Sequence, residues 1–155
     1  MRLKYHVLAS TVTSAVYGYF FHSWTGTLAC FFSGILIDLD HVLDYQIIKK
    51  KFWITLKELE DYCFHNREGR IYLIFHSYEL LLILWVTTQF FSNPTWVGLI
   101  FGMTVHMLFD QFTNGTHPLA YFWCFRARYG FLHKIFFKEI FERDILRVSN
   151  ETSKV

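Results

Sequence analysis

The chain has 155 residues, enough for one domain with a substantial core. Hydrophobic residues make up 53% of it and aromatic residues 21%, whereas charged residues make up only 18%, below the usual quarter of soluble domains. This composition favours a membrane protein. The net charge of +2 is too small to predict a nucleic-acid partner. Cys30, Cys63 and Cys124 match no zinc or redox spacing, so we interpret them as reduced core residues.

Four apolar segments predict most of the helices. They cover about residues 5–21, 27–43, 71–91 and 96–112. The third is the clearest candidate to cross the ~30 Å hydrocarbon layer of a bilayer. We therefore expect an all-α, membrane-embedded bundle of about four helices, in a single domain of residues 1–148 with a frayed tail at 149–155. The alternative is a soluble bundle of very apolar helices.

The positions of lysine and arginine predict the orientation of the bundle. The connections 22–26 and 92–95 contain neither residue type. Every Lys and Arg lies before the first segment, between the second and third, or after the fourth. With four spans these three regions fall on one side, which the positive-inside rule makes cytoplasmic. We expect a multi-pass protein of the cell (inner) membrane with both termini in the cytoplasm.

Two amphipathic stretches lie outside the apolar segments. The connection after the second segment contains three consecutive lysines and then apolar residues near helical spacing over 52–59. This pattern predicts a short interfacial helix with Trp53 at the lipid headgroups. Residues 131–148 predict an amphipathic C-terminal helix. That helix either packs on the bundle or lies on the cytoplasmic leaflet, with its basic residues near anionic lipid.

Histidines and carboxylates interrupt all four apolar segments. Such groups are costly on or near a buried helix unless they pair or bind a metal. In the predicted topology they all fall in the cytoplasmic third of the bundle, although the charge argument does not require it. We therefore expect them to converge on one metal site. The members of this set are His6, Asp38, Asp40, His41, His76, Glu79, His106 and Asp110.

The spacing within this set suits metal coordination. Three pairs recur at i,i+3 or i,i+4 and therefore share a helix face. Carboxylates and imidazoles on facing helices build metal sites in bundles, and mixed oxygen and nitrogen ligands suit zinc, manganese or iron. Asp40 and His41 each either ligate the metal or hold a ligand imidazole. The three pairs are Asp38 with His41, His76 with Glu79, and His106 with Asp110.

Other interpretations stay open for individual residues. His6 taken alone is typical of a hydrogen-bonding or capping residue at a membrane interface. Glu79 is a ligand, a general base, or the partner of an arginine such as Arg67 or Arg70. We expect Asp44 to face solvent rather than the site.

The motifs resemble those of a known family. The chain contains His6, then the stretch Gly34-Ile-Leu-Ile-Asp-Leu-Asp-His41, then His76-Ser77 and a His106-xxx-Asp110 pair. In this order they are similar to the membrane-bound metal-dependent hydrolases, a family distantly related to zinc-dependent phospholipase C and the zinc single-strand nucleases. The resemblance covers about residues 1–118. It implies an all-α fold and a clustered zinc site that hydrolyses phosphoesters.

The same resemblance implies a set of metal ligands. The later His-xxx-Glu pair of the phospholipase relatives is not matched, because Phe137 stands four residues after His133. We therefore expect one or two ions rather than three. The residues that the resemblance makes metal ligands are His6, Asp38, His76, His106, Asp110 and His117.

The predicted function is hydrolysis of a phosphoester at the membrane. A bound metal would activate a water molecule, with Asp38 or Glu79 as general base. Arg67 or Arg70 could hold the phosphate of the substrate. Because the site lies near the headgroups, a membrane lipid or another phosphodiester is the expected substrate. The alternative is a metal-binding or metal-transport protein without catalysis; membrane di-iron oxidation is disfavoured because the HxxxH and HxxHH boxes are absent.

Overall fold

The computed structural model describes residues 3–65 and 69–136 and is all-helical there, which confirms the predicted fold class. An isolated bridge between Arg70 and Leu132 is the β pairing found within these two ranges. The helices are α1 (Leu3–Phe21), α2 (Trp24–Leu36), α3 (Leu39–Lys49), α4 (Leu56–His65), α5 (Tyr78–Thr87), α6 (Pro94–Thr113), α7 (Trp123–Arg128) and the 3₁₀ helix η1 (His133–Phe136).

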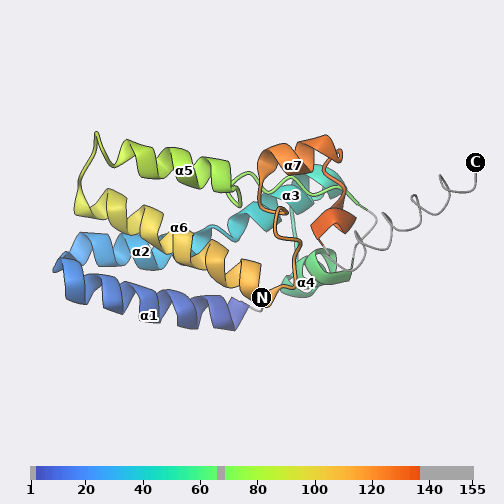
Figure 1. Cartoon of the computed structure of the whole chain (residues 1–155). Coiled ribbons are helices and arrows are strands. Elements are labelled where there is room, and N and C mark those ends of the chain that lie inside the picture. Colours follow the sequence, from blue (N-terminus) through green and yellow to red (C-terminus); the bar gives the residue numbers. More distant parts are fainter. Residues whose placement is uncertain (1–2, 66–68, 137–155) are drawn as a thin grey trace, which may run out of the picture.

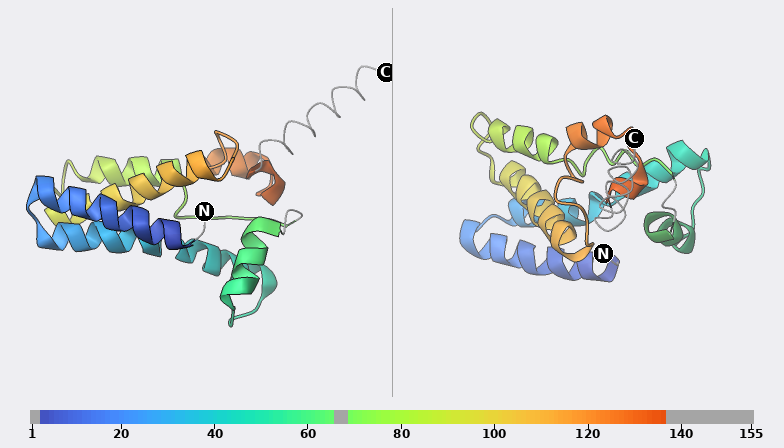
Figure 2. Two further views of the ribbon diagram at one scale, coloured as in Figure 1. Left: turned by 90° about the horizontal axis from the view of Figure 1, so that it is seen from below. Right: turned by 45° about the vertical axis from the view of Figure 1, so that its right-hand side comes forward.

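The helices form a bundle with a cap at one end. The long helices α1, α2 and α6 lie side by side, and α5 packs along α6 (Figure 1). The shorter elements α3, α4, α7 and η1 gather at the end where the chain begins (Figures 1 and 2). The hydrophobic core continues from α5 and α6 into this cap, where Ile71, Ala120 and Ile135 are buried.

Glycines bring the backbones of α2 and α6 into direct contact. A Cβ built on Gly98 would lie 2.2 Å from the carbonyl oxygen of Gly26, and one built on Gly102 would lie 2.2 Å from that of Cys30. No larger residue fits at either position without moving the two helices apart. The spacing of four residues continues along α6 to His106 and Asp110, so the stripe that packs on α2 ends in candidate ligands.

Helix α1 packs on the same pair through small and polar residues. Ser10 and Ser14 are buried, and a Cβ on Gly34 would lie 2.6 Å from Ser10 Oγ. The hydroxyl of the buried Tyr17 donates to the Pro94 carbonyl at 2.7 Å, which ties α1 to the start of α6. These contacts place His6, one turn before Ser10, beside the ends of α2 and α6.

The second apolar segment is not one continuous helix. Helix α2 ends at Leu36 and α3 begins at Leu39, with i,i+3 hydrogen bonds from the Asp38 N–H to the Ile35 carbonyl and from the Asp40 N–H to the Ile37 carbonyl. Asp38 is therefore the N-cap residue of α3, although its side chain caps no backbone N–H. Taken together, Trp24–Lys49 is the one helical stretch in the described ranges that is long and apolar enough to cross a membrane.

The third apolar segment corrects the prediction of a long spanning helix. Only Tyr78–Thr87 is helical, a length of about 15 Å at 1.5 Å per residue. Residues 71–77 run in a non-helical path, in which Leu73 adopts a left-handed φ of 46°. Ile71 and Leu73 are as buried as helix core residues. Hydrophobicity therefore identified a buried segment but not its backbone conformation.

Other predictions change at the capped end. The helix after the lysine run is α4, Leu56–His65; Phe52 and Trp53 precede it in a loop and are 84% and 87% exposed. We expected Asp44 to face solvent, and this was wrong. Asp44 is buried and accepts a hydrogen bond from the Tyr72 N–H at 2.7 Å. Most of the predicted C-terminal helix and the tail lie outside the described residues.

The cysteines are free, in agreement with their predicted reduced state. Cys30 is buried between α2 and α6, as a core residue should be. Cys63 is half-buried, and Cys124 is exposed, so the core interpretation was wrong for Cys124.

The glycine contact predicts a strong effect of a small change. We expect Gly98→Val to destabilise the protein by about 3 kcal/mol, the upper end of the usual cost of overpacking, and to lower its melting temperature in detergent by roughly 10 °C. Ala15→Val adds a similar volume at an exposed position of α1 and should change it little. Equal melting temperatures for the two variants would show that α2 and α6 are not in backbone contact.

Candidate metal centre

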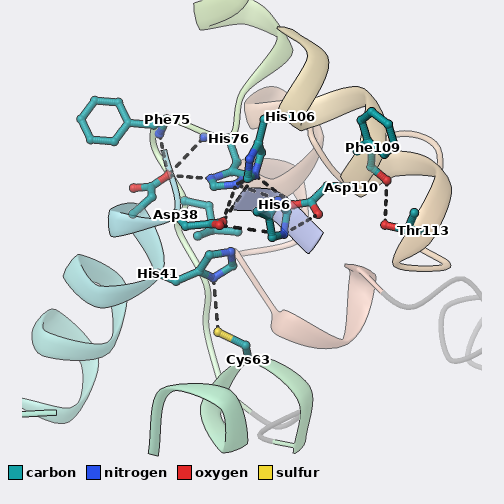
Figure 3. Close-up of polar contacts among 12 residues, drawn as sticks. His6, Asp38, His41, Cys63, Phe75, His76, His106, Phe109, Asp110 and Thr113 are labelled. Carbon is teal, nitrogen blue, oxygen red and sulfur yellow. Dashed lines mark hydrogen bonds and ion pairs between the residues drawn. The ribbon is translucent and has the colours of Figure 1, made fainter. Parts of the chain in front are cut away.

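Four candidate ligands meet where α1 begins and where α2 and α6 end. His6, Asp38, His106 and Asp110 each offer a ligand atom, and these atoms lie within 4.8 Å of one another. Figure 3 shows the side chains pointing toward a common centre. His6, His106 and Asp110 are buried, whereas the side chain of Asp38 keeps 22% of its surface exposed. Asp38 is therefore the carboxylate through which this cluster meets its surroundings.

A second group adjoins the first. Asp38, His41 and His76 also offer ligand atoms within 4.8 Å of one another, so Asp38 belongs to both groups. His76 is fully buried and comes from the non-helical segment before α5 rather than from a helix. If each group held an ion, Asp38 would be the residue that both groups share.

Oxygen acceptors orient two of the imidazoles. His106 Nδ1 lies 2.7 Å from the Gly34 carbonyl, so it carries the proton and donates to that oxygen. His76 Nδ1 lies 3.4 Å from Asp40 Oδ2. In both residues this arrangement leaves Nε2 for the centre of the cluster. Such oxygen partners on the far nitrogen are typical of histidines that bind metals.

The separations between ligand atoms fit a metal ion. His106 Nε2 lies 3.4 Å from both Asp38 Oδ1 and Asp110 Oδ2. His6 Nε2 lies 3.4 Å from Asp110 Oδ1 and 3.8 Å from Asp38 Oδ2. A tetrahedral ion with bonds of about 2.1 Å, as zinc makes to nitrogen and oxygen, holds neighbouring ligand atoms about 3.4 Å apart. The donor set of imidazole nitrogens and carboxylate oxygens therefore fits zinc or a similar divalent ion.

The histidines also lie against one another. His76 Nε2 and His106 Nε2 are 3.3 Å apart, and the rings of His6 and His106 stack at 4.2 Å. Three imidazoles this close would repel one another if all were protonated. A shared cation removes that conflict, because it binds the neutral rings through their unprotonated nitrogens.

Asp40 lies behind the cluster rather than in it. Its Oδ2 accepts hydrogen bonds from the Phe75 N–H at 2.6 Å and the His76 N–H at 3.1 Å, in addition to its contact with the His76 ring. Asp40 is therefore placed to hold a ligand imidazole, the second of the two roles expected for it. His41 belongs to the second group and its Nδ1 lies 3.5 Å from Cys63 Sγ.

Glu79 lies outside both groups. Its carboxylate accepts hydrogen bonds from the Trp123 and Cys124 N–H groups at 2.8 and 3.0 Å and from the Ser77 hydroxyl at 2.8 Å. It thereby caps the N-terminus of α7, where an anion is favoured by the unpaired backbone donors. Glu79 therefore caps α7 and belongs to neither ligand group, and its role as general base stays a prediction.

The predicted site residues His117 and Arg70 are not brought to the cluster. His117 belongs to neither group, and its ring stacks on Phe125. The side chain of Arg70 is exposed, and its carbonyl accepts from the Tyr62 hydroxyl. Arg67 lies outside the described residues. The phosphate-binding role expected of the two arginines therefore stays a prediction.

Arg126 is a functional candidate that the sequence reasoning missed. It is fully buried at the start of the cap, and burial lowers the pKa of its guanidinium to about 10. Its side chain donates to the carbonyls of Tyr72, Leu73 and His76. The available signal was Arg126 directly after the aromatic-rich run 121–125, with Arg128 two residues further on.

A small pocket adjoins the cluster between α1 and α6, and it reaches two of the candidate ligands. Its volume of about 10 Å³ is close to the space that one water molecule needs, and Ser10 and Thr13 supply hydroxyl groups to its wall. The pocket is lined by His6, Ala9, Ser10, Thr13, Gly102, Val105, His106 and Phe109.

No protein-family model, curated protein or solved structure matches this chain.

The cluster predicts bound metal in the purified protein. We expect elemental analysis to find one or two divalent ions per chain in the wild type and none at stoichiometric level in His106→Ala/Asp110→Ala, which removes two of the four ligands of the first group. The matched control is His22→Asn/Asp61→Asn, which changes one exposed histidine and one exposed aspartate elsewhere. Metal loss in the control as well, or no metal in the wild type, would contradict the site.

Proposed function

We propose that the protein is a membrane-embedded, metal-dependent hydrolase that acts on a phosphoester. The observation that carries this proposal is the convergence of His6, Asp38, His106 and Asp110 in one cluster, beside a second group that shares Asp38. Buried ionisable groups at this density are rare without a ligand and mark functional sites. The motif resemblance to membrane-bound metal-dependent hydrolases supports the same reaction class.

The residues divide the chemical tasks. A divalent metal, when bound, lowers the pKa of a water molecule and polarises a phosphoryl oxygen. His6, His106 and Asp110 would hold the ion from the buried side. Asp38 is the partly exposed carboxylate of the cluster, so it is the group that can accept a proton from the attacking nucleophile. Zinc suits this ligand set, and manganese is the second choice.

The exposed surface supports a position within a membrane. Many large apolar side chains of the bundle are strongly exposed, which is what contact with lipid would require of them. α1 and α6 contain 19 and 20 residues, about 28 and 30 Å, so their length would suffice for the hydrocarbon layer, whereas Trp24–Lys49 is the described stretch that is apolar enough as well. The most exposed of these side chains include Tyr19, Phe20, Trp24, Leu82, Phe90 and Phe91.

A multi-pass arrangement is compatible with the short helix α5. Residues 71–77 continue the path of α5 toward the capped end without being helical (Figure 1). Non-helical backbone is tolerated at membrane depth where it is buried in protein, and Ile71, Leu73 and His76 are buried. In this proposal α1, α2, α5 and α6 cross the membrane of the cell.

The basic residues support a cytoplasmic cap. Within the described ranges, lysine and arginine lie at the start of α1 and in the cap elements, the end at which the metal cluster also lies. Exposed Phe52 and Trp53 follow the lysine run 49–51 there, a combination typical of the headgroup region. The cluster would then face the lipid headgroups, which makes a phosphate-containing lipid the favoured substrate.

Activity in detergent tests the hydrolase proposal. We expect the zinc-loaded wild type to hydrolyse a phosphodiester lipid, and His106→Ala/Asp110→Ala to be at least about 100-fold slower, since loss of the metal removes the activated nucleophile. A chelator should abolish the wild-type activity, and His22→Asn/Asp61→Asn should retain it. Equal rates of hydrolysis for the wild type and His106→Ala/Asp110→Ala would contradict the proposal.

One observation favours a transport protein as the second candidate. The pocket beside His6 and His106 continues to Ser10 and Thr13, which extend polar groups along α1. Uptake of zinc into proteoliposomes, without hydrolysis of any phosphoester, would support this candidate over the first.

Membrane extraction tests the location. We expect the protein to stay in the membrane pellet after washing with alkaline carbonate, because several apolar helices cross the bilayer. A soluble bundle attached to the membrane surface would be released by the same wash. Solubilisation should require detergent.

A further inference from the structure

The backbone of residues 72–76 is held from two sides by buried charges. On one side are carboxylates of α3: Asp44 Oδ2 accepts from the Tyr72 N–H at 2.7 Å, and Asp40 Oδ2 accepts from the N–H groups of Phe75 and His76 at 2.6 and 3.1 Å. Figure 3 shows the Phe75 and His76 contacts beside the cluster. Asp40 and Asp44 are only 2% and 3% exposed.

On the other side is the guanidinium of Arg126 in α7. Its Nη1 donates to the Tyr72 carbonyl and, at 2.9 Å, to the Leu73 carbonyl. Its Nη2 donates to the His76 carbonyl at 2.9 Å. Tyr72 and His76 are therefore bonded through both their N–H and their C=O groups, to a carboxylate on one side and to Arg126 on the other.

This arrangement accounts for a buried arginine that has no direct carboxylate partner among the described residues. A buried charge is costly unless other groups compensate it. Here the aligned peptide groups lie between Arg126 and the two aspartates, whose negative charges favour the protonated guanidinium. A planar guanidinium can reach three carbonyls at once, whereas a lysine ammonium on its flexible stem cannot hold this geometry.

The hydrogen bonds to residues 72–76 determine the position of His76. Leu73 is held at a φ of 46°, a region that non-glycine residues rarely adopt, so the surrounding bonds determine the path of the chain. Asp40 binds both the backbone N–H and the ring Nδ1 of His76. The same clamp therefore sets where the His76 ring starts and which way Nε2 points.

We propose that Arg126 is a positioning residue of the metal centre, which aims His76 at the bound ion by clamping the backbone of residues 72–76 against Asp40 and Asp44. This inference rests on the proposed metal site and adds a residue to it from the far side of the segment. A purely structural arginine would stabilise the cap without any specific link to His76.

A double-mutant cycle separates the two roles. We expect Arg126→Met to weaken zinc binding 10- to 100-fold, the usual effect of losing a group that orients a ligand. In a His76→Ala background the same change should have almost no further effect, because there is no ring left to aim. In a His6→Ala background it should still weaken binding 10- to 100-fold. Arg128→Met, at an exposed arginine of the same helix, is the matched control.

The cycle also has a result that overturns the proposal. If Arg126→Met weakens zinc binding as strongly in the His76→Ala background as in the wild type, Arg126 does not act through His76. The visible spectrum of the cobalt-substituted protein gives a second readout, since Arg126→Met should shift the absorption bands in the same direction as His76→Ala. An unchanged spectrum would count against the proposal.

Hydrogen exchange tests the clamp even if Arg126→Met does not fold or the protein binds no metal. If Arg126→Met does not fold, Arg126→Lys replaces it, and faster exchange of the Tyr72, Phe75 and His76 amides supports the clamp. If the wild type binds no zinc, the proposed function fails, but exchange still decides on the clamp. Exchange at these amides that matches the wild type would overturn the role of Arg126 in either case.

Discussion

The contact between α2 and α6 is the constraint on which the rest of the structure depends. Gly98 and Gly102 allow backbone to meet backbone, and this contact sets the register of the two helices. Two turns beyond Gly98, the register brings His106 Nδ1 to the Gly34 carbonyl at 2.7 Å. The glycine contact thus fixes the tautomer of a candidate ligand as well as the spacing of the bundle. Close helix contact through small residues is a common way to associate helices in lipid, where the hydrophobic effect does not drive association.

The cap places His76 beside the cluster, although His76 lies in a non-helical segment. A non-helical chain inside a protein must find partners for its peptide groups. Asp40, Asp44 and Arg126 supply them between residues 72 and 76, at the cost of burying three ionisable groups. These bonds hold His76 beside the cluster although no helix carries it. Stability of the cap and geometry of the cluster are therefore coupled through one short segment.

The location of the cluster connects the fold to the proposed reaction. The candidate ligands lie at the end of the bundle that carries the basic residues, while the opposite end and the sides expose aromatic and aliphatic residues. If the bundle lies in a membrane, this places the cluster near lipid phosphates rather than at the centre of the bilayer. A hydrolase gains from that depth, because both a lipid headgroup and water reach it.

The sequence by itself determined the helical class and the local pairs. Long apolar segments predict helices, and the spacing of His106 and Asp110 puts both on one helix face whatever surrounds them. Only the tertiary structure decided the break at Ile37 and Asp38, the non-helical path before α5, the burial of Asp44 and the capping role of Glu79. The reason is physical: hydropathy measures burial and not backbone conformation, and the partners are remote in sequence. Asp44 bonds Tyr72, Glu79 bonds Trp123, and Arg126 bonds His76, so no local pattern could predict these pairs.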